Sequence, residues 1–222
     1  MKKREFKDNV YSELAKITKS MANPHRLEII ELLAQGEFSV EQIAKHTGLS
    51  VANASQHLQV LKAAYLVDIN RHGNFIYYRL SDGNVFKAWK ALRDLGVERI
   101  ATIEKVVKDF RKSKFDFETV TIDGLIGKLR SGKVTILDVR PESEFKQGHI
   151  ADAISIPINE LSKRLKDIPK QTEVVAYCRG PFCLYADEAI RILSKAGYKV
   201  ARLEEGFPDW KLQGLPVEIS LN

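Results

Sequence analysis

Long hydrophobic runs and cysteine are both scarce in this 222-residue chain. Its apolar runs are far too short to cross a bilayer, which takes about 20 consecutive apolar residues. Residues 1–6 are basic, but no apolar stretch of the kind found in a signal peptide follows them. The two cysteines, Cys178 and Cys183, stand close together. Without an export signal, this usage predicts a cytoplasmic protein with a working thiol, and it argues against a disulfide framework.

Histidine is also sparse, with five residues at positions 25, 46, 57, 72 and 149. None of their separations matches the spacing of paired metal ligands on a helix or in a loop. We therefore expect neither a metal site nor another cofactor.

Acidic residues are balanced against basic ones in only one half of the chain. Residues 1–113 carry 19 Lys and Arg against 13 Asp and Glu, whereas residues 114–222 carry 16 of each. The whole net charge of +6 therefore lies in the first half. Such an asymmetry is typical of a domain that binds a polyanion, although an ordinary solvated basic surface gives the same count.

The pattern predicts two domains. Residues 1–112 are mostly helical with one hairpin, and residues 118–222 alternate strand and helix. The polar, charged stretch 111–114 indicates a linker between them, which we place at 113–117. The predicted fold class is a mainly-α domain followed by an α/β domain with a parallel sheet.

Three short helices follow one another in the first domain. The first has Pro24 in its first turn, the second covers 40–47 after Ser39, and the third runs from a Ser50 cap to about 64. In the third helix Val51, Ala54, Leu58 and Leu61 recur at spacings of 3, 4 and 3, which predicts a buried face. The runs 66–70 and 75–80 then predict a hairpin with a basic tip at 71–74.

The other face of the third helix carries short hydrogen-bonding side chains and no acidic residue. Such a face suits a helix that enters the major groove of DNA, although an ordinary polar surface helix is the alternative. Together with the helix, glycine turn and hairpin, it predicts a winged helix-turn-helix.

The segments 22–27, 50–58 and 73–80 resemble the ArsR/SmtB family of small dimeric bacterial repressors, and the likeness extends over about 10–110. The resemblance implies a recognition helix at 50–64, a wing at 71–74, and terminal helices that pair two subunits. The apolar positions of 85–110 suit such a pairing helix, with a kink or break expected at Gly96. The side chains implied in binding operator DNA are Ser50, Asn53, Ser55, Gln56, His57, Gln59, Lys62 and Arg71.

The chain departs from the metal-sensing members of that family. Those members carry a Cys-x-Cys pair at the start of the helix before the recognition helix, where this chain has Ser39 and Glu41. Others bind zinc through His and carboxylates on the last helix, but residues 85–110 contain no His. We therefore expect no metal sensing, and the first half has no cysteine with which to sense thiols.

Both cysteines belong to one hexapeptide, residues 178–183. The apolar run 174–177 predicts a strand before it, and 184–196 predicts an amphipathic helix closed by Gly197. Cys178 would then sit in a loop that leads into a helix N-terminus. Free backbone N–H groups and the helix dipole lower a thiol pKa there, which predicts a nucleophilic thiolate.

Four segments in order, 134–140, 148–150, 178–183 and 203–210, resemble a rhodanese domain over about 118–218. The resemblance implies a five-stranded parallel α/β domain. It also implies that Cys178 takes sulfur from a small donor such as thiosulfate or polysulfide and carries it as a persulfide. The implied anion cradle is the backbone of Arg179, Gly180, Pro181, Phe182, Cys183 and Leu184, with Asp138 and Arg140 beside or behind the loop.

Several roles in this half stay open. Arg179 would either attract an anionic donor or form a surface salt bridge, and Asp138 is expected to be structural. Cys183 would either resolve sulfur carried on Cys178 or be a small buried residue in the first helical turn. His149 is expected to pack or hydrogen-bond. The bulky Pro181 and Phe182 are expected to narrow the donor range.

Together these features predict a homodimeric transcriptional regulator that binds double-stranded operator DNA and responds to reactive sulfur or redox state through Cys178. The alternative is a thiosulfate or persulfide sulfurtransferase with an appended DNA-binding domain. A third interpretation is an arsenate reductase-like thiol site. No membrane partner is expected.

Overall fold

A computed structural model of the chain describes residues 2–112, 117–132 and 134–220. It separates into two compact units, Met1–Leu92 and Arg93–Asn222. Most of the predicted linker, 113–116, lies outside the described residues. The division between the units falls inside a helix before that linker, and the domain boundaries at 112 and 118 stay a prediction.

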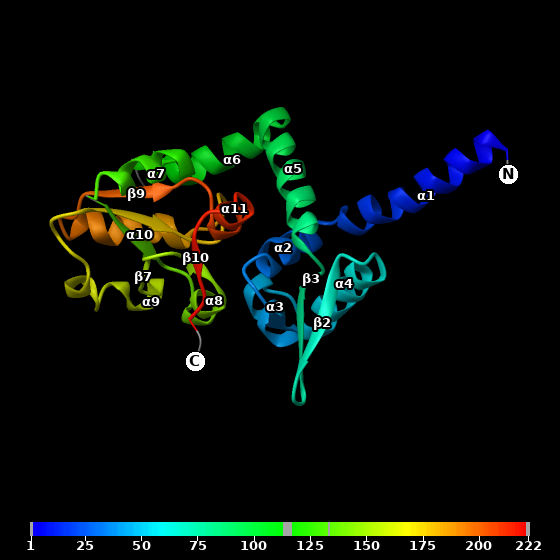
Figure 1. The fold of residues 1–222 in the computed structure, drawn as a ribbon, viewed down its shortest axis with the longest axis horizontal. Helices are drawn as coiled ribbons and strands as arrows, with labels where there is room; N and C mark the ends of the chain where they lie inside the picture. The colour runs from blue at the N-terminus through cyan, green and yellow to red at the C-terminus, as the bar shows by residue number, and fades with distance from the viewer. Residues whose placement is uncertain (1, 113–116, 133, 221–222) are drawn as a thin grey trace. The chain divides into compact units, whose positions relative to one another are not determined.

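The first unit is a helical domain with a small antiparallel sheet of order β1-β3-β2 (Figure 1). Its elements are α1 (Lys3–Met21), α2 (Pro24–Leu33), β1 (Phe38–Ser39), α3 (Val40–Thr47), α4 (Val51–Ala63), β2 (Val67–His72) and β3 (Phe75–Leu80). This order, helix-turn-helix and then hairpin, is the winged helix-turn-helix expected from the sequence.

Local hydrogen bonds fix the ends of these helices. Ser39 and Gln42 form a capping box at the start of α3, and Gly48 ends that helix with a left-handed φ of 68°. The Ser50 hydroxyl then accepts the Asn53 N–H to begin α4. Of the predicted buried positions in α4, Ala54, Leu58 and Leu61 lie in the core, but Val51 is exposed. Val51 is the first residue of the helix, one turn before its first core contact.

The hairpin is longer than expected. Arg71 and His72 belong to β2, where they pair with Ile76 and Phe75, so the turn consists of Gly73 and Asn74 rather than 71–74. Gly73 has a φ of 62°, which a glycine adopts without strain.

Two helices follow the hairpin, α5 (Gly83–Arg99) and α6 (Ala101–Lys112). The break lies at Ile100, not at Gly96 as expected. Gly96 stays helical because its carbonyl oxygen accepts the Ile100 N–H at 2.8 Å. The apolar positions predicted to form one pairing helix are therefore divided between two helices.

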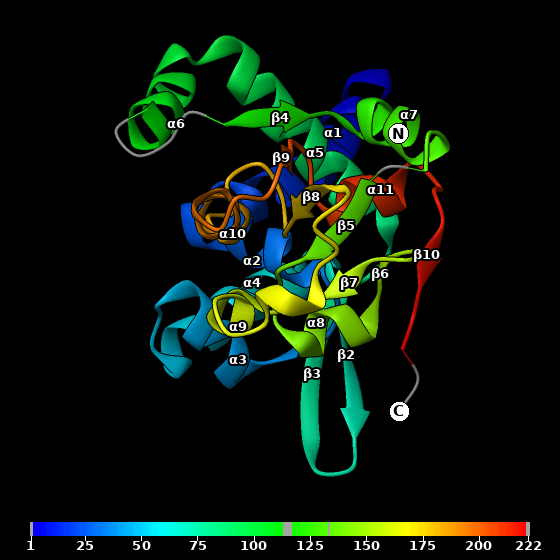
Figure 2. The ribbon, with the colours of Figure 1, turned by 90° about the vertical axis from the view of Figure 1, so that its left-hand side faces the viewer.

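The second unit is built on a parallel sheet of order β4-β9-β8-β5-β7 (Figure 2), the five strands that the resemblance implied. The strands of that sheet are β4 (Glu118–Val120), β5 (Val134–Asp138), β7 (Ile154–Ser155), β8 (Glu173–Tyr177) and β9 (Val200–Leu203). A separate antiparallel pair joins β6 (His149–Ile150) to β10 (Val217–Glu218). The helices are α7 (Ile122–Arg130), α8 (Glu142–Gln147), α9 (Ile158–Leu161), the 3-10 turn η1 (Leu165–Asp167), α10 (Tyr185–Lys195) and α11 (Phe207–Leu212).

Helices cover both faces of this sheet. Leu161 of α9 and Leu193 of α10 belong to one apolar cluster, while Leu125 of α7 and Trp210 of α11 belong to the other. A strand buried on both faces is apolar along its whole length, as β8 is. The carboxyl ends of β5, β8 and β9 lie side by side, and loops at such an edge commonly build binding sites.

No helix within the described parts of the chain has both the length and the apolar character of a membrane span.

Candidate functional site

Cys178 follows β8 directly, and α10 begins at Tyr185, so the strand, loop and helix expected around the cysteines are present. The Cys178 side chain is buried, with 1% of the residue exposed. Its Sγ lies 3.9 Å from the carbonyl oxygen of Gly180 and 3.6 Å from that of Cys183. The loop thus wraps closely around the sulfur.

The pKa values of the two thiols are shifted in opposite directions. Burial raises the pKa of Cys178, but a hydrogen bond with the Cys183 thiol and the charge of Arg202 oppose that effect. Backbone N–H groups of Ala186 and Gly180 lower the pKa of Cys178 further, to about 7. The bond to Cys178, followed by burial, raises the pKa of Cys183 well above its usual value. Cys178 is therefore the more acidic of the two thiols, and its role as the nucleophile stays a prediction.

Both cysteines are free in this structure. Cys183 is half-buried and packs against the apolar cluster under α10 while its thiol faces Cys178. The arrangement suits either of the two roles considered for Cys183, and its role as a resolving thiol stays a prediction.

The low pKa predicts how Cys178 reacts with pH. Because the thiolate is the nucleophile, the alkylation rate of Cys178 should rise with pH, reach half its maximum near pH 7 and then level off. Peptide mass spectrometry after timed iodoacetamide pulses would give this profile. Cys183→Ser should move the midpoint to higher pH, since the hydrogen bond from the Cys183 thiol lowers the pKa of Cys178. A wild-type midpoint near the ordinary thiol value of 9.0 would contradict the prediction.

The anion cradle differs from the one the resemblance implied. Pro181 has no N–H, and the Cys183 N–H donates to the Gly180 carbonyl at 3.1 Å within the loop. The backbone N–H groups of Gly180 and Ala186 are among those that lower the pKa of Cys178, and the cradle as a whole stays a prediction. Ala186 lies beyond the predicted loop, in the first turn of α10, because the helix N-terminus turns its free N–H groups toward the sulfur.

A buried arginine that the sequence analysis missed, Arg202, binds carbonyl oxygens of the cysteine loop. Arg202 extends from β9, and its Nη2 donates to the carbonyl oxygens of Gly180 and Pro181, each at 3.1 Å. Its Nε lies 3.0 Å from the carboxylate of Asp187 in α10, in the geometry of an ion pair and not of a hydrogen bond. The available signal was a lone charge inside the apolar strand 200–203.

Arg179 is already paired. Its guanidinium donates to both carboxylate oxygens of Glu144 in α8, and Glu144 is fully buried. The Arg179 guanidinium also lies 5.4 Å from the centre of the Tyr185 ring. The salt bridge is thus present, and it is buried where a surface one was expected. Any role of Arg179 in attracting an anionic donor stays a prediction.

Asp138 and Arg140 form a fully buried ion pair at the end of β5. The Nη2 of Arg140 lies 2.6 Å from Asp138 and 2.8 Å from the Gly148 carbonyl oxygen. The guanidinium also lies 4.4 Å from the centre of the Phe207 ring. These contacts tie together the loops after β5 and β9, which is the structural role expected of Asp138. His149 packs on Phe145, with ring centres 3.6 Å apart.

The residues predicted to contact DNA are spread over α4 and β2. Those that are exposed are Ser50, Asn53, Gln56, Gln59, Lys62 and Arg71. Ser55 and His57 are half-buried, and the His57 ring lies 5.5 Å from that of His25 at the start of α2. Burial, followed by the charges of Arg26 and His25, lowers the pKa of His57. His57 therefore faces α2, and the exposed polar side chains of α4 are those of Asn53, Gln56, Gln59 and Lys62.

Helix α1 has an uncovered apolar stripe. Phe6, Val10, Leu14 and Ile17 recur at helical spacing, and each is at least 40% exposed. An apolar stripe of this kind on a helix is a surface suited to a partner helix.

Among the described residues, no three His, Cys, Asp or Glu side chains are grouped so that they could hold a metal ion.

Two family profiles match the chain. Residues 23–68 match the arsR family of bacterial regulatory proteins, and residues 121–213 match the rhodanese-like domain. The chain is 40% identical over 206 residues to the HTH-type transcriptional regulator Rv0324 of Mycobacterium tuberculosis, covering 93% of this chain and 90% of that protein.

Each half also has its own relatives. A sulfurtransferase of Allochromatium vinosum is 36% identical over 85 residues, or 38% of this chain and 78% of that protein. A solved structure, the homodimeric winged helix-turn-helix DNA-binding domain of Mb0332 from Mycobacterium bovis, is 36% identical, with a TM-score of 0.42. That match covers 45% of this chain and 91% of the other.

Proposed function

Since the chain belongs to the ArsR family of HTH-type transcriptional regulators and carries a C-terminal rhodanese domain, we propose that its affinity for operator DNA responds to sulfur loaded on Cys178. The observation that carries this proposal is the buried Cys178 sulfur at the end of β8, enclosed by the loop that contains Cys183 and that Arg202 binds. The low pKa of Cys178, about 7, agrees with this geometry. In the cytoplasm a thiolate of that acidity is available to react with sulfane sulfur.

Sulfur loading needs no oxidant beyond the donor. The Cys178 thiolate attacks the outer sulfur of thiosulfate, a new S–S bond forms, the S–S bond of the donor breaks, and sulfite leaves with the electron pair. Cys183 can then transfer its proton to the outer sulfur and attack Sγ of Cys178; the new Cys178–Cys183 S–S bond forms, the persulfide S–S bond breaks, and the outer sulfur leaves as HS⁻ with the electron pair. In this second step the sulfane sulfur is reduced and the two cysteines are oxidised.

The DNA-binding half would act as a homodimer. Two recognition helices spaced by one helical turn of DNA need a two-fold pair of subunits. The exposed stripe of α1 supplies an apolar surface for such a pair. In the dimer Gln56 and Gln59 of each α4 would face base edges, and Arg71 of each wing would contact phosphate.

The test combines sulfur loading with a DNA titration. A fluorescent duplex would be enriched by the reduced protein from a random-sequence pool and titrated with reduced and polysulfide-treated protein. We expect wild type to gain sulfur at Cys178 and its Kd to change by about tenfold, within the usual range of allosteric coupling. Cys178→Ser should gain no sulfur at this loop and show no change in Kd.

Cys183→Ser is the matched control, because it leaves the nucleophile in place. It should stop at the Cys178 persulfide, whereas wild type proceeds to the disulfide if Cys183 resolves the persulfide. A Cys178→Ser protein whose Kd still responds fully to polysulfide would refute the proposal.

The similarity to a sulfurtransferase keeps enzymatic sulfur transfer as a second candidate. It predicts repeated rapid turnover of thiosulfate with cyanide or a thiol as acceptor. A regulator needs only a single loading event.

A further inference from the structure

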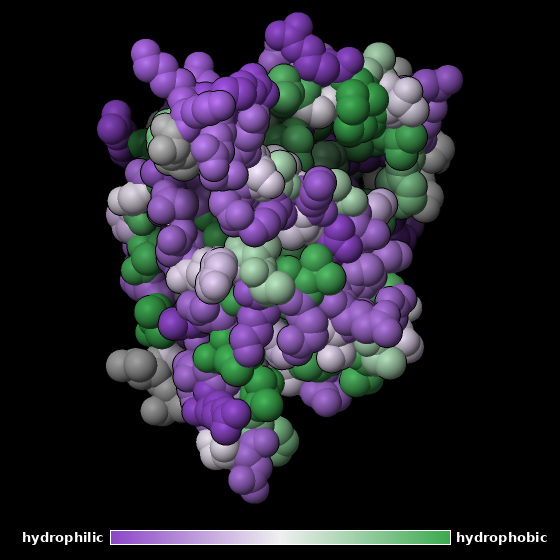
Figure 3. All heavy atoms as spheres, turned by 90° about the vertical axis from the view of Figure 1, so that its right-hand side faces the viewer, coloured by the Kyte–Doolittle hydropathy of each residue, from purple (hydrophilic) through white to green (hydrophobic). Residues whose placement is uncertain are grey.

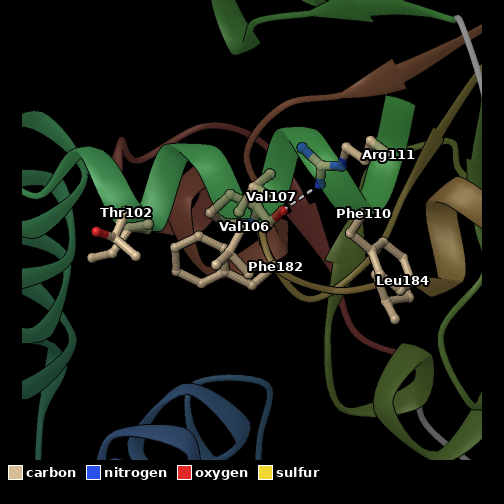
Figure 4. Close-up of a pocket in the computed structure, with 9 residues that line it drawn as sticks. Thr102, Val106, Val107, Phe110, Arg111, Phe182 and Leu184 are labelled. Carbon is tan, nitrogen blue, oxygen red and sulfur yellow. Dashed lines mark hydrogen bonds between the residues drawn. The ribbon is translucent and has the colours of Figure 1, made fainter. Parts of the chain in front are cut away.

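The side chain of Arg111, at the end of helix α6, contacts the cysteine loop and α10. Its Nη2 donates to the carbonyl oxygen of Pro181 at 2.6 Å (Figure 4), and its Nε lies 3.5 Å from the carboxylate of Asp187. Only 23% of the Arg111 side chain is exposed. An arginine fixed by two partners in this way gives α6 an ordered contact with the loop and with α10.

Arg111 shares both partners with Arg202. The Pro181 carbonyl accepts from Arg202 at 3.1 Å, and the Asp187 carboxylate lies 3.0 Å from the Arg202 Nε. Arg202 in turn holds the Gly180 carbonyl, which is one of the two next to the Cys178 sulfur. A continuous set of polar contacts therefore runs from Cys178 to α6.

An open apolar pocket adjoins this contact. Its volume is about 520 Å³, and it is lined by Val106, Val107 and Phe110 from α6 and by Phe182 and Leu184 from the loop (Figure 4). Phe182, Leu184, Val106 and Phe110 all remain substantially exposed. A close-packed interface resists displacement, but an open one does not. The Arg111 hydrogen bond is thus a direct polar contact between these two segments, at the edge of an open pocket.

We expect sulfur loading on Cys178 to displace the loop. A persulfide places a second sulfur about 2 Å beyond Sγ, in a site where the residue is 1% exposed. The neighbouring Gly180 and Cys183 carbonyl oxygens repel the added anion, while Arg202 attracts it. The anion competes with the loop carbonyls for Arg202, and the loop must rearrange.

We infer that Arg111 is the positioning residue that transmits sulfur loading from the cysteine loop to α6. Loading displaces the Pro181 carbonyl, which breaks the Arg111 contact and releases the end of α6. Helix α6 follows α5 in the chain, and the start of α5 belongs to the DNA-binding unit. This inference rests on the proposed function and names the residue through which the same site is coupled.

Hydrogen exchange of the full chain tests the first step without DNA. In wild type, polysulfide loading should speed exchange of the α6 amides by about tenfold. Arg111→Met should show this fast exchange already when reduced, with no further rise on loading. Lys108→Met is the control on the same helix, because Lys108 is exposed and pairs with Glu104 on the helix surface. It should behave as wild type.

The DNA titration tests the second step. Arg111→Met should load sulfur on Cys178 as wild type does, yet its reduced and loaded forms should have Kd values within about twofold of each other. Arg111→Lys keeps a charge near Asp187 but loses the planar fork, and it should give an intermediate response. This milder variant supplies the answer if the methionine variant does not fold.

The outcomes separate the two ideas. A wild-type Kd that ignores loading overturns the proposed function, and with it this inference. A wild-type response that Arg111→Met and Arg111→Lys both retain in full overturns only the role of Arg111. Exchange in α6 that loading leaves unchanged in wild type does the same.

Discussion

Asp138→Ala should lower the free energy of unfolding of the rhodanese domain by about 3–5 kcal/mol. The substitution leaves the Arg140 guanidinium fully buried without the carboxylate that now accepts its Nε and Nη2 hydrogen bonds. The same carboxylate also accepts the Arg140 backbone N–H at 2.9 Å, and that N–H would lose its acceptor. Breaking one side of a buried pair costs more than the pair itself contributes, because an uncompensated charge remains.

Calorimetry is the appropriate measurement, since two compact units need not melt as one. The transition of the rhodanese domain should move down by at least about 12 °C, at roughly 4 °C per kcal/mol. Glu142→Ala is the control. Glu142 is exposed and pairs with Lys146 on the helix surface, so the change should stay within about 0.5 kcal/mol. Equal changes in the free energy of unfolding from the two substitutions would show that the buried pair contributes no more than a surface pair.

Gly206→Ala should nearly abolish sulfur loading on Cys178. A Cβ at position 206 would lie 2.3 Å from the carbonyl carbon and oxygen of Arg179 and 2.5 Å from the Gly180 nitrogen. The Gly206 backbone is extended, with φ of −126°, so alanine meets a collision and no backbone strain. The next residue is fixed by the Phe207 N–H donating to the Cys178 carbonyl oxygen at 3.2 Å. The cysteine loop must therefore move.

A displacement of about 1 Å in a reacting group can cost 100-fold in rate, and we expect at least that loss in the rate of sulfur loading. Overpacking should also lower the free energy of unfolding by about 1–3 kcal/mol. Gly127→Ala in α7 is the matched control, because no atom lies within 4 Å of a Cβ there. It should load sulfur normally and gain about 0.5–1 kcal/mol in stability. Normal loading in Gly206→Ala would mean that the loop tolerates the shift.

The sequence predicted features that depend on a few neighbouring residues. Ser39 and Ser50 begin their helices because their side chains accept backbone N–H groups only three positions away. The strand before Cys178 was recognisable because a strand buried on both faces is continuously apolar. The prediction failed at Val51 and at Gly96, where helical spacing alone could not tell which turn reaches the core and which residue ends a helix.

The sequence by itself determined the two domain types, the position of Cys178 between a strand and a helix, and the outward polar face of α4, because caps, turns and periodicity act over short distances. Tertiary structure decided which charges surround the cysteine. Arg111, Asp187 and Arg202 meet at the loop only because β9 lies beside β8 and α10 packs across the sheet. Likewise, Glu144 reaches Arg179 from another part of the chain. Buried charges are costly unless paired, but no local pattern says which distant partner will be present, since strand order selects it.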